Sequence, residues 1–150
     1  MFALLKKVRR FILWVWKQEG SSAQRARGIA VGVFSGCFPL FGLQTLLGIM
    51  LASLFKGNHL LAAAGTWISN PLTYIPLYWL NFKIGSFFLD QPLPLSHSVQ
   101  TLNKQELWNQ GWFFSARLLL GSTLVGSILG ISTGFVCYFL LKSYSEEQTF

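Results

Sequence analysis

The chain has 150 residues, a length that favours a single domain. Hydrophobic residues make up 52% of it and charged residues only 11%, less than half of the roughly 25% that is usual in soluble domains. This composition excludes a disordered chain, a disulfide-rich secreted scaffold and an ordinary soluble enzyme. The net charge of +7 narrows the partners to a membrane surface or a nucleic acid.

The first predicted element is a basic amphipathic helix over residues 2–17. Its apolar positions recur with helical spacing, its lysines and arginines fall mostly on the other side, and Trp14 and Trp16 suit the headgroup region of a bilayer. A cleaved signal peptide and a solvated helix packed on its own protein are the alternatives. Seven of the 12 basic residues lie in the first 27 positions, directly before a long apolar stretch. This pattern favours a membrane over nucleic acid and predicts a cytoplasmic N-terminus.

Three long runs without Asp, Glu, Lys or Arg follow, at residues 28–55, 57–82 and 118–141. Each run is longer than the about 20 apolar residues that a membrane-spanning helix needs. A soluble protein of this length would not carry three of them. We therefore expect an all-α, integral membrane helical bundle in which the chain passes the membrane several times.

The first two runs are interrupted near their middle. The first contains Gly36, Pro39 and Gly42, and the second contains Pro71 and Pro76. Proline removes a backbone donor and clashes with the preceding turn, so the helix before it ends or kinks. Both runs are predicted to be broken helices that either span or re-enter the membrane.

These breaks predict a polar site, because unpaired backbone inside a membrane must be covered by protein or water. Asn70 is predicted to cap a helix that starts at Pro71. Interrupted segments at matching places in two halves are typical of transporter binding sites, and two proline-kinked helices without a ligand are the alternative. The polar side chains that could line the site are Gln44, Thr45, Ser69, Asn70 and Thr73.

Small residues recur at every fourth position in two places, and in lipid such stripes let helix backbones approach closely. The two stripes are predicted to pack on each other or across a dimer. The first stripe consists of Gly28, Gly32 and Gly36, and the second of Ser122, Gly126, Gly130 and Gly134.

The remaining segments are polar. Residues 84–110 are predicted to form a loop with a short surface helix around 98–110. The chain is accordingly divided into an N-terminal helix at 1–27, a membrane domain at 28–141 and a polar tail at 142–150.

The sequence offers little for catalysis, because residues 28–89 contain no Asp or Glu. His59 and His97 are interpreted as loop histidines, and Cys37 and Cys137 as small buried apolar residues. General acid–base pairs and metal sites need several such groups together, so we expect no enzyme, no metal and no cofactor.

An anionic, amphiphilic substrate suits this chain better than a coupled proton. The helix starts near the two breaks would present backbone N–H groups and a positive dipole end to a phosphate. The basic residues that flank the apolar runs could bind the same headgroup, or could instead extend to the membrane interface. These residues are Arg25, Arg27, Lys83 and Arg117.

The residues around the breaks resemble a known family. The matching pattern is Gly32-x-Phe34-x-Gly36-x-x-Pro39-x-x-Gly42-x-Gln44, then Asn58, then Gly65-Thr66-x-x-x-Asn70-Pro71-x-Thr73-x-x-Pro76, with Gly85 downstream. Over roughly residues 25–140 the chain resembles the DUF2062 family of bacterial membrane proteins. That resemblance implies a bacterial inner-membrane location, and the broken helices are similar in architecture to the DedA-type lipid transport proteins.

The family has no established activity to carry over, and some members resemble fusions to glycosyltransferase-type domains. The expected function is therefore a small transporter or scramblase-like protein for a lipid or polyprenyl-phosphate. The alternative is a non-catalytic membrane scaffold that positions a partner enzyme of envelope glycan or lipid synthesis. Membrane lipids are the expected partners, with a second copy of the chain as another candidate.

Overall fold

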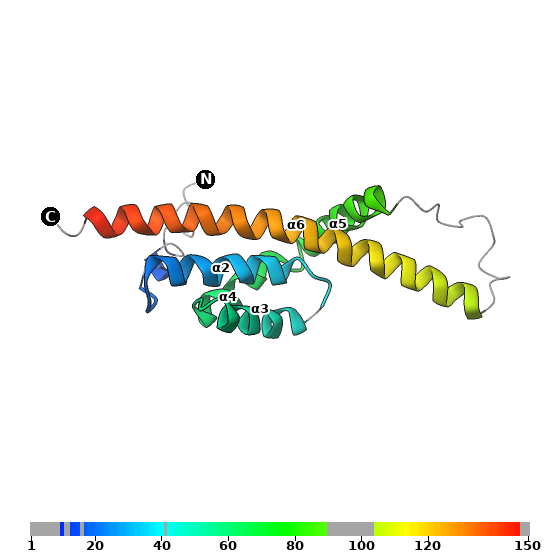
Figure 1. The fold of residues 1–150 in the computed structure, drawn as a ribbon, viewed down its shortest axis with the longest axis horizontal. Helices are drawn as coiled ribbons and strands as arrows, with labels where there is room; N and C mark the ends of the chain where they lie inside the picture. The colour runs from blue at the N-terminus through cyan, green and yellow to red at the C-terminus, as the bar shows by residue number, and fades with distance from the viewer. Residues whose placement is uncertain (1–9, 11–12, 16, 41, 90–103, 148–150) are drawn as a thin grey trace.

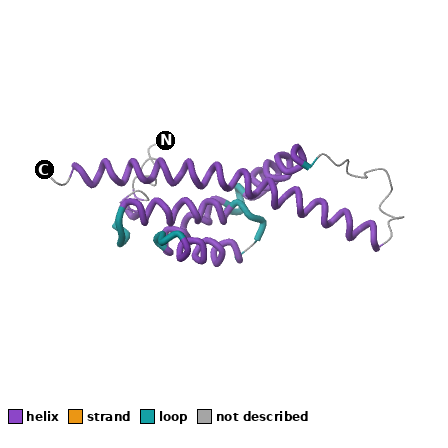
Figure 2. The backbone as a smooth tube through the Cα atoms, viewed as in Figure 1, coloured by secondary structure: helices purple, strands orange, loops and turns teal. Residues whose placement is uncertain are grey.

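The computed structural model describes residues 10, 13–15, 17–40, 42–89 and 104–147, and no strand occurs among them (Figures 1 and 2). The predicted all-α class is thereby confirmed. Most of the basic helix expected over 2–17 lies outside the described residues. The elements are α2 (Ser22–Gly36), α3 (Leu43–Leu54), α4 (His59–Gly65), the 3₁₀ turn η1 (Thr66–Ile68), α5 (Tyr74–Phe88) and α6 (Lys104–Glu147).

Helix α2 starts at a capping box formed by Ser21 and Gln24. The Ser21 hydroxyl accepts the Gln24 backbone N–H at 3.2 Å, and the Gln24 side chain accepts the Ser21 N–H at 2.9 Å. Such reciprocal bonds satisfy two of the donors that a helix start leaves unpaired. The expected domain boundary between residues 27 and 28 consequently falls inside α2.

The first apolar run is divided between two helices that lie against each other. Helix α2 ends at Gly36, and α3 begins at Leu43 and returns along α2 (Figure 1). Gly42 precedes α3 with a φ of 82°, a left-handed conformation that favours glycine. The run that could have been one span is therefore a helical hairpin.

The second apolar run is also divided, into α4, η1 and α5. Asn58 joins the start of α4 to the first turn of α2 and to the segment before it. Its backbone N–H donates to the Gln24 carbonyl and its side-chain amide to the Glu19 carbonyl, both at 3.0 Å. The Asn58 Oδ1 in turn accepts the Leu61 N–H at 2.9 Å and caps α4.

Helix α6 is the long element of the fold. It has 44 residues, or about 65 Å at a rise of about 1.5 Å per residue. Within the described ranges, its segment Gly111–Ser143 is the one helix long and apolar enough to cross a membrane. The short surface helix expected around 98–110 is not separate where it is described, because residues 104–110 belong to α6.

Helix α2 lies between α4 and α6 (Figure 1). A Cβ at Gly28 or Gly32 would overlap the backbone carbonyls of Asn58 and Ala62, so this stripe packs on α4. The α6 stripe packs on another face of α2: a Cβ at Gly130 would meet the Ala30 carbonyl at 2.8 Å. Within the chain, then, the two small-residue stripes do not pack on each other. The α2 stripe faces α4, and the α6 stripe packs on the other side of α2.

Helices α5 and α6 cross at a very close approach built from two glycines. A Cβ at Gly121 would overlap the Asn81 carbonyl, and a Cβ at Gly85 would overlap the Arg117 carbonyl. Each helix thus places a glycine opposite the backbone of the other. Any side chain at either glycine would push the helices apart.

Candidate functional site

The first helix break exposes carbonyl groups that α5 satisfies. After α2 ends, the Cys37 carbonyl accepts from the Asn81 side-chain amide at 2.8 Å, and the Phe38 carbonyl accepts from the Tyr78 hydroxyl at 3.2 Å. Pro39 follows directly, in the segment between α2 and α3. Carbonyls that a helix no longer uses need another partner when they are buried, and two polar side chains of α5 supply it here.

Asn81 connects three helices. Its amide nitrogen also donates to the Ser122 hydroxyl of α6 at 2.9 Å, and all three residues, Cys37, Asn81 and Ser122, are fully buried. We call these three residues the Asn81 junction. Among the residues that the structure describes, the Asn81 Oδ1 has no hydrogen-bond partner. A buried amide of this kind is costly unless its bonds are made, so the junction fixes how α2, α5 and α6 meet.

The second break is closed by Asn70, although the helix start differs from the predicted one. The Asn70 Oδ1 accepts the backbone N–H groups of Leu72 at 2.9 Å and Thr73 at 3.2 Å. Helix α5 begins at Tyr74, not at Pro71, because residues 71–73 form a turn before it. The cap predicted for Asn70 therefore stabilises this turn and not the first turn of α5.

Thr73 and Pro76 complete the second break. The Thr73 hydroxyl donates to the Ile68 carbonyl at the end of η1, and it accepts the Asn70 backbone N–H at 2.9 Å. Pro76 lies in the first turn of α5, where the helix does not need its missing N–H.

Short polar contacts join α3 to the second broken segment. The Ser69 hydroxyl donates to the Gln44 Oε1 at 3.2 Å, and the hydroxyls of Thr45 and Thr66 are 3.2 Å apart. The structure therefore brings Gln44 together with Ser69, while Thr45 pairs with Thr66, which the sequence reasoning did not select. Of the side chains predicted to line a binding site, Gln44 thus bonds to Ser69 and Asn70 bonds to Thr73, whereas Thr45 bonds outside the predicted set.

The four basic residues predicted to flank the apolar runs do not converge. Arg25 and Arg27 lie in α2, and the Arg27 Nε donates to the Ala23 carbonyl at 3.2 Å. Lys83 lies on α5 with its ammonium 4.1 Å from the centre of the Trp79 ring, a cation–π contact. Arg117 is only 3% exposed, at the crossing of α5 and α6.

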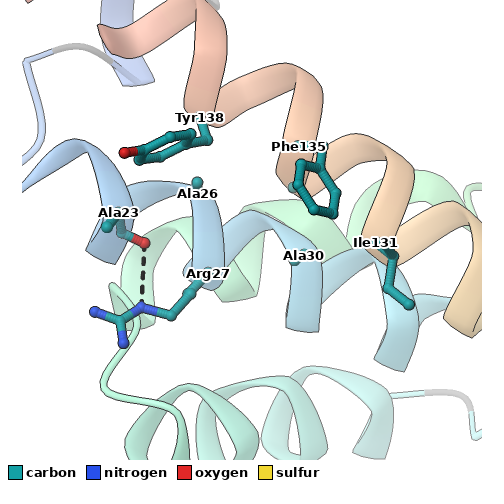
Figure 3. Close-up of a pocket in the computed structure, with 8 residues that line it drawn as sticks. Ala23, Ala26, Arg27, Ala30, Ile131, Phe135 and Tyr138 are labelled. Carbon is teal, nitrogen blue, oxygen red and sulfur yellow. Dashed lines mark hydrogen bonds between the residues drawn. The ribbon is translucent and has the colours of Figure 1, made fainter.

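Two adjoining cavities run along the contact between α2 and α6. The first, of about 280 Å³, lies between Ala23, Ala26 and Arg27 of α2 and Phe135 and Tyr138 of α6 (Figure 3). The second, of about 360 Å³, extends to Phe34, to Phe55 just after α3 and to Gly126. Ala30 and Ile131 line both cavities. We call the two together the α2–α6 groove; Gln44 and Asn70 do not line it.

Sequence reasoning missed Asn81 and this groove. Asn81 lies near the end of an apolar run, four residues before Gly85. A polar residue one helical turn from a glycine was the sequence feature that could have indicated a buried helix contact. Both cysteines are free; Cys37 is buried as expected, whereas Cys137 is only partly buried. Among the residues that the structure describes, no three His, Cys, Asp or Glu side chains gather into a group that could hold a metal.

Comparison with known proteins agrees with the motif resemblance. Residues 5–149 match the model of a family described as "Uncharacterized protein conserved in bacteria (DUF2062)". Neither the curated proteins nor the solved structures gave a match.

Proposed function

The chain belongs to the DUF2062 family, and we propose that it is an integral membrane protein of the bacterial inner membrane, a small transporter or scramblase-like protein for a lipid or polyprenyl-phosphate. The observation that carries the proposal is the Asn81 junction, where the first helix break meets α5 and α6 through buried polar groups. Broken helices that meet at polar groups within an apolar bundle are typical of transport sites.

The charge pattern of α2 and α6 supports a common membrane boundary. The two helices are antiparallel neighbours, and Arg27 and Tyr138 line the same cavity. The charge-free run of α2 starts just after Arg27, and that of α6 ends just before Lys142. Both helices therefore change from apolar to charged residues at the same depth in the membrane. Tyr138, an aromatic residue of the kind found at membrane interfaces, lies beside this boundary.

From this boundary the α2–α3 hairpin reaches about half of the membrane depth. Gly28–Gly36 extends about 13 Å, and the hydrocarbon core of a bilayer is about 30 Å thick. Helix α3 then returns, and Gly57, just after Lys56, packs against Gly28. We infer a re-entrant hairpin with its break near the bilayer middle.

The second broken segment continues where the hairpin turns back. Helix α4 and η1 run beside α2, since Gly65 packs against Gly32 and a Cβ at Gly36 would meet the Thr66 carbonyl at 2.9 Å. Helix α5 then extends towards the far end of α6. In this topology α4, η1 and α5 form one broken span, α6 forms the second, and both ends of the chain are cytoplasmic.

Cysteine accessibility in intact cells tests this topology. The native cysteines are first replaced by Cys37→Ala and Cys137→Ala. In this background the single variants Lys56→Cys and Lys142→Cys should resist a membrane-impermeant thiol reagent. A cysteine at Ser96, between α5 and α6 in the sequence, should react with it. Labelling of Lys142→Cys from outside would contradict the common boundary.

Lipid movement in liposomes tests the function. Liposomes that contain the full chain should exchange fluorescent phosphatidylglycerol between leaflets at least about tenfold faster than empty ones, which corresponds to a barrier lowered by about 1.4 kcal/mol. Asn70→Asp should fold at near-normal levels, because aspartate offers the same oxygen to the N–H groups of Leu72 and Thr73. It should lose most of the lipid exchange, because a carboxylate at the break repels an anionic headgroup.

Asn70→Ala is the structural comparison, since it removes the cap and should lower stability by about 1 kcal/mol. If Asn70→Asp retains full exchange, the second break takes no part in lipid passage.

A non-catalytic membrane scaffold is the second candidate function. The observation in its favour is that the polar side chains at the breaks bond to one another, as Ser69 does to Gln44. Closed contacts of this kind stabilise a rigid bundle that could hold a partner enzyme of the envelope. Liposomes without lipid exchange, together with a partner enzyme that co-purifies with the chain, would favour it.

A further inference from the structure

We propose that the α2–α6 groove holds one hydrocarbon chain of an anionic membrane lipid, with the lipid phosphate at Arg27. The inference deepens the proposed function and rests on it, because it requires α6 to cross a membrane. It assigns a lipid class and a position, neither of which follows from the polar groups at the breaks.

The groove exists because both helices carry small residues where they meet. Gly130 and Gly134 of α6 face Ala26 and Ala30 of α2, and Gly126 faces Phe34. Larger residues such as Ile131 and Phe135 stand beside this contact and form the walls (Figure 3). Together the two cavities follow α2 from Ala23 to Phe34 along its contact with α6.

The length of the groove fits within one leaflet. From Arg27, at the membrane boundary, it extends inward along α2 to Phe34, about 10 Å at about 1.5 Å per residue. Half of a typical hydrocarbon core is about 15 Å. The groove would therefore cover a single lipid chain, starting at the headgroup level, over about two thirds of the depth of its leaflet.

The walls of the groove suit a hydrocarbon chain. Ile131 is 60% exposed and Phe135 is 62% exposed, although both line the cavity. Leaving such side chains in water is unfavourable by roughly 25 cal/mol per Å² of apolar surface. A lipid chain would cover them at the same time as it fills the space.

One end of the groove is positively charged. The Arg27 side chain is exposed, its Nε is held by the Ala23 carbonyl, and its guanidinium group extends away from Phe135 and Ile131 (Figure 3). Lys142 follows Tyr138 by about one turn on α6, and the first turn of α2 contains no acidic residue. A phosphate would supply the negative charge that this end lacks. The planar guanidinium group of arginine can form two parallel hydrogen bonds to phosphate oxygens.

The inner end of the groove meets the Asn81 junction. A Cβ at Gly126 would lie 3.3 Å from the Cys37 Cβ, and the Cys37 carbonyl is the group that Asn81 binds. A lipid chain in the groove would thus end beside the first helix break.

Lipid titration of the purified full chain in detergent, read by native mass spectrometry, tests this assignment. The unmodified chain should bind phosphatidylglycerol more tightly than zwitterionic phosphatidylcholine. Ile131→Trp should fill the groove and weaken phosphatidylglycerol binding at least about tenfold. Ile128→Trp is the matched control: Ile128 is 65% exposed on the same helix and lines neither cavity, so binding should stay within about twofold, a difference under about 0.5 kcal/mol.

The charge is tested separately. Arg27→Gln should weaken phosphatidylglycerol binding about fivefold and leave phosphatidylcholine binding unchanged. Lys56→Gln removes one charge from an exposed turn outside the groove and should change neither. Should Ile131→Trp unfold the protein, as judged by circular dichroism, Ala23→Leu narrows the same cavity from α2.

Equal binding of both lipids by the unmodified chain, or equal effects of Ile131→Trp and Ile128→Trp, would overturn the inference. If binding follows the expected pattern but liposomes show no lipid exchange, only the proposed function fails. If exchange occurs and binding is indifferent to Ile131 and Arg27, only the groove assignment fails.

Discussion

Gly121→Ala is expected to lower the free energy of unfolding by about 3 kcal/mol, at the upper end of what overpacking costs. The added methyl group would overlap the Asn81 carbonyl, which belongs to the backbone of α5 and cannot rotate away. Helices α5 and α6 would have to separate, and the bond between Asn81 and Ser122 would lengthen with them. Thermal unfolding in detergent, followed by circular dichroism, measures the effect.

Gly111→Ala is the matched control on the same helix. A Cβ at Gly111 would meet nothing within 4 Å, so alanine there brings only its better helix propensity. The expected result is a gain of up to about 1 kcal/mol. If the same glycine-to-alanine change lowers stability at Gly121 and raises it at Gly111, the α5–α6 contact, and not helix propensity, determines the effect at Gly121. A Gly121→Ala protein as stable as the unmodified chain would mean that the two helices do not meet at this distance.

Asn81→Ala is expected to lower the free energy of unfolding by about 2–3 kcal/mol. The change leaves the Cys37 carbonyl and the Ser122 hydroxyl buried without the amide that binds them both, and α2 loses a link to α5 and α6. The melting temperature in detergent measures the loss.

Ser122→Ala separates the two bonds of Asn81. It removes the contact with α6 and keeps the contact with Cys37, so about 1 kcal/mol should be lost. Ser127→Ala is the control, since that hydroxyl donates to the Thr123 carbonyl within α6, and it should cost no more than about 0.5 kcal/mol. If Asn81→Ala costs no more than Ser122→Ala, the bond to the first break contributes nothing to stability.

The helix breaks could be predicted because their causes are local. Proline lacks the N–H that a helix interior needs, and glycine accepts the positive φ found at Gly42. The break between Gly36 and Leu43 and the turn around Asn70 therefore occur where the residue types require them. The start of α5 was predicted three residues too early, because the turn at residues 71–73 depends on the Thr73 hydroxyl bond to Ile68.

The partner of each helix face could not be predicted in the same way. A stripe of small residues shows that some backbone comes close, but α2 carries small residues on two faces. Gly28 and Gly32 meet α4, and Ala30 meets α6. Likewise, Arg117 was expected to flank a span and is instead buried at the α5–α6 crossing.

Composition and local patterns alone account for the helical class, the positions of the two breaks, the apolar part of α6 and the motifs of the DUF2062 family, because each depends on residues within a few turns of one another. Only the packed chain decides that Cys37 and Asn81, 44 residues apart, share a hydrogen bond, or that Arg27 and Tyr138 line one cavity. Helical spacing states which side of a helix is apolar or small, and it carries no information about which helix will cover that side. That choice follows from close backbone contacts, such as those of Gly85 and Gly121, which form only when all the helices pack together.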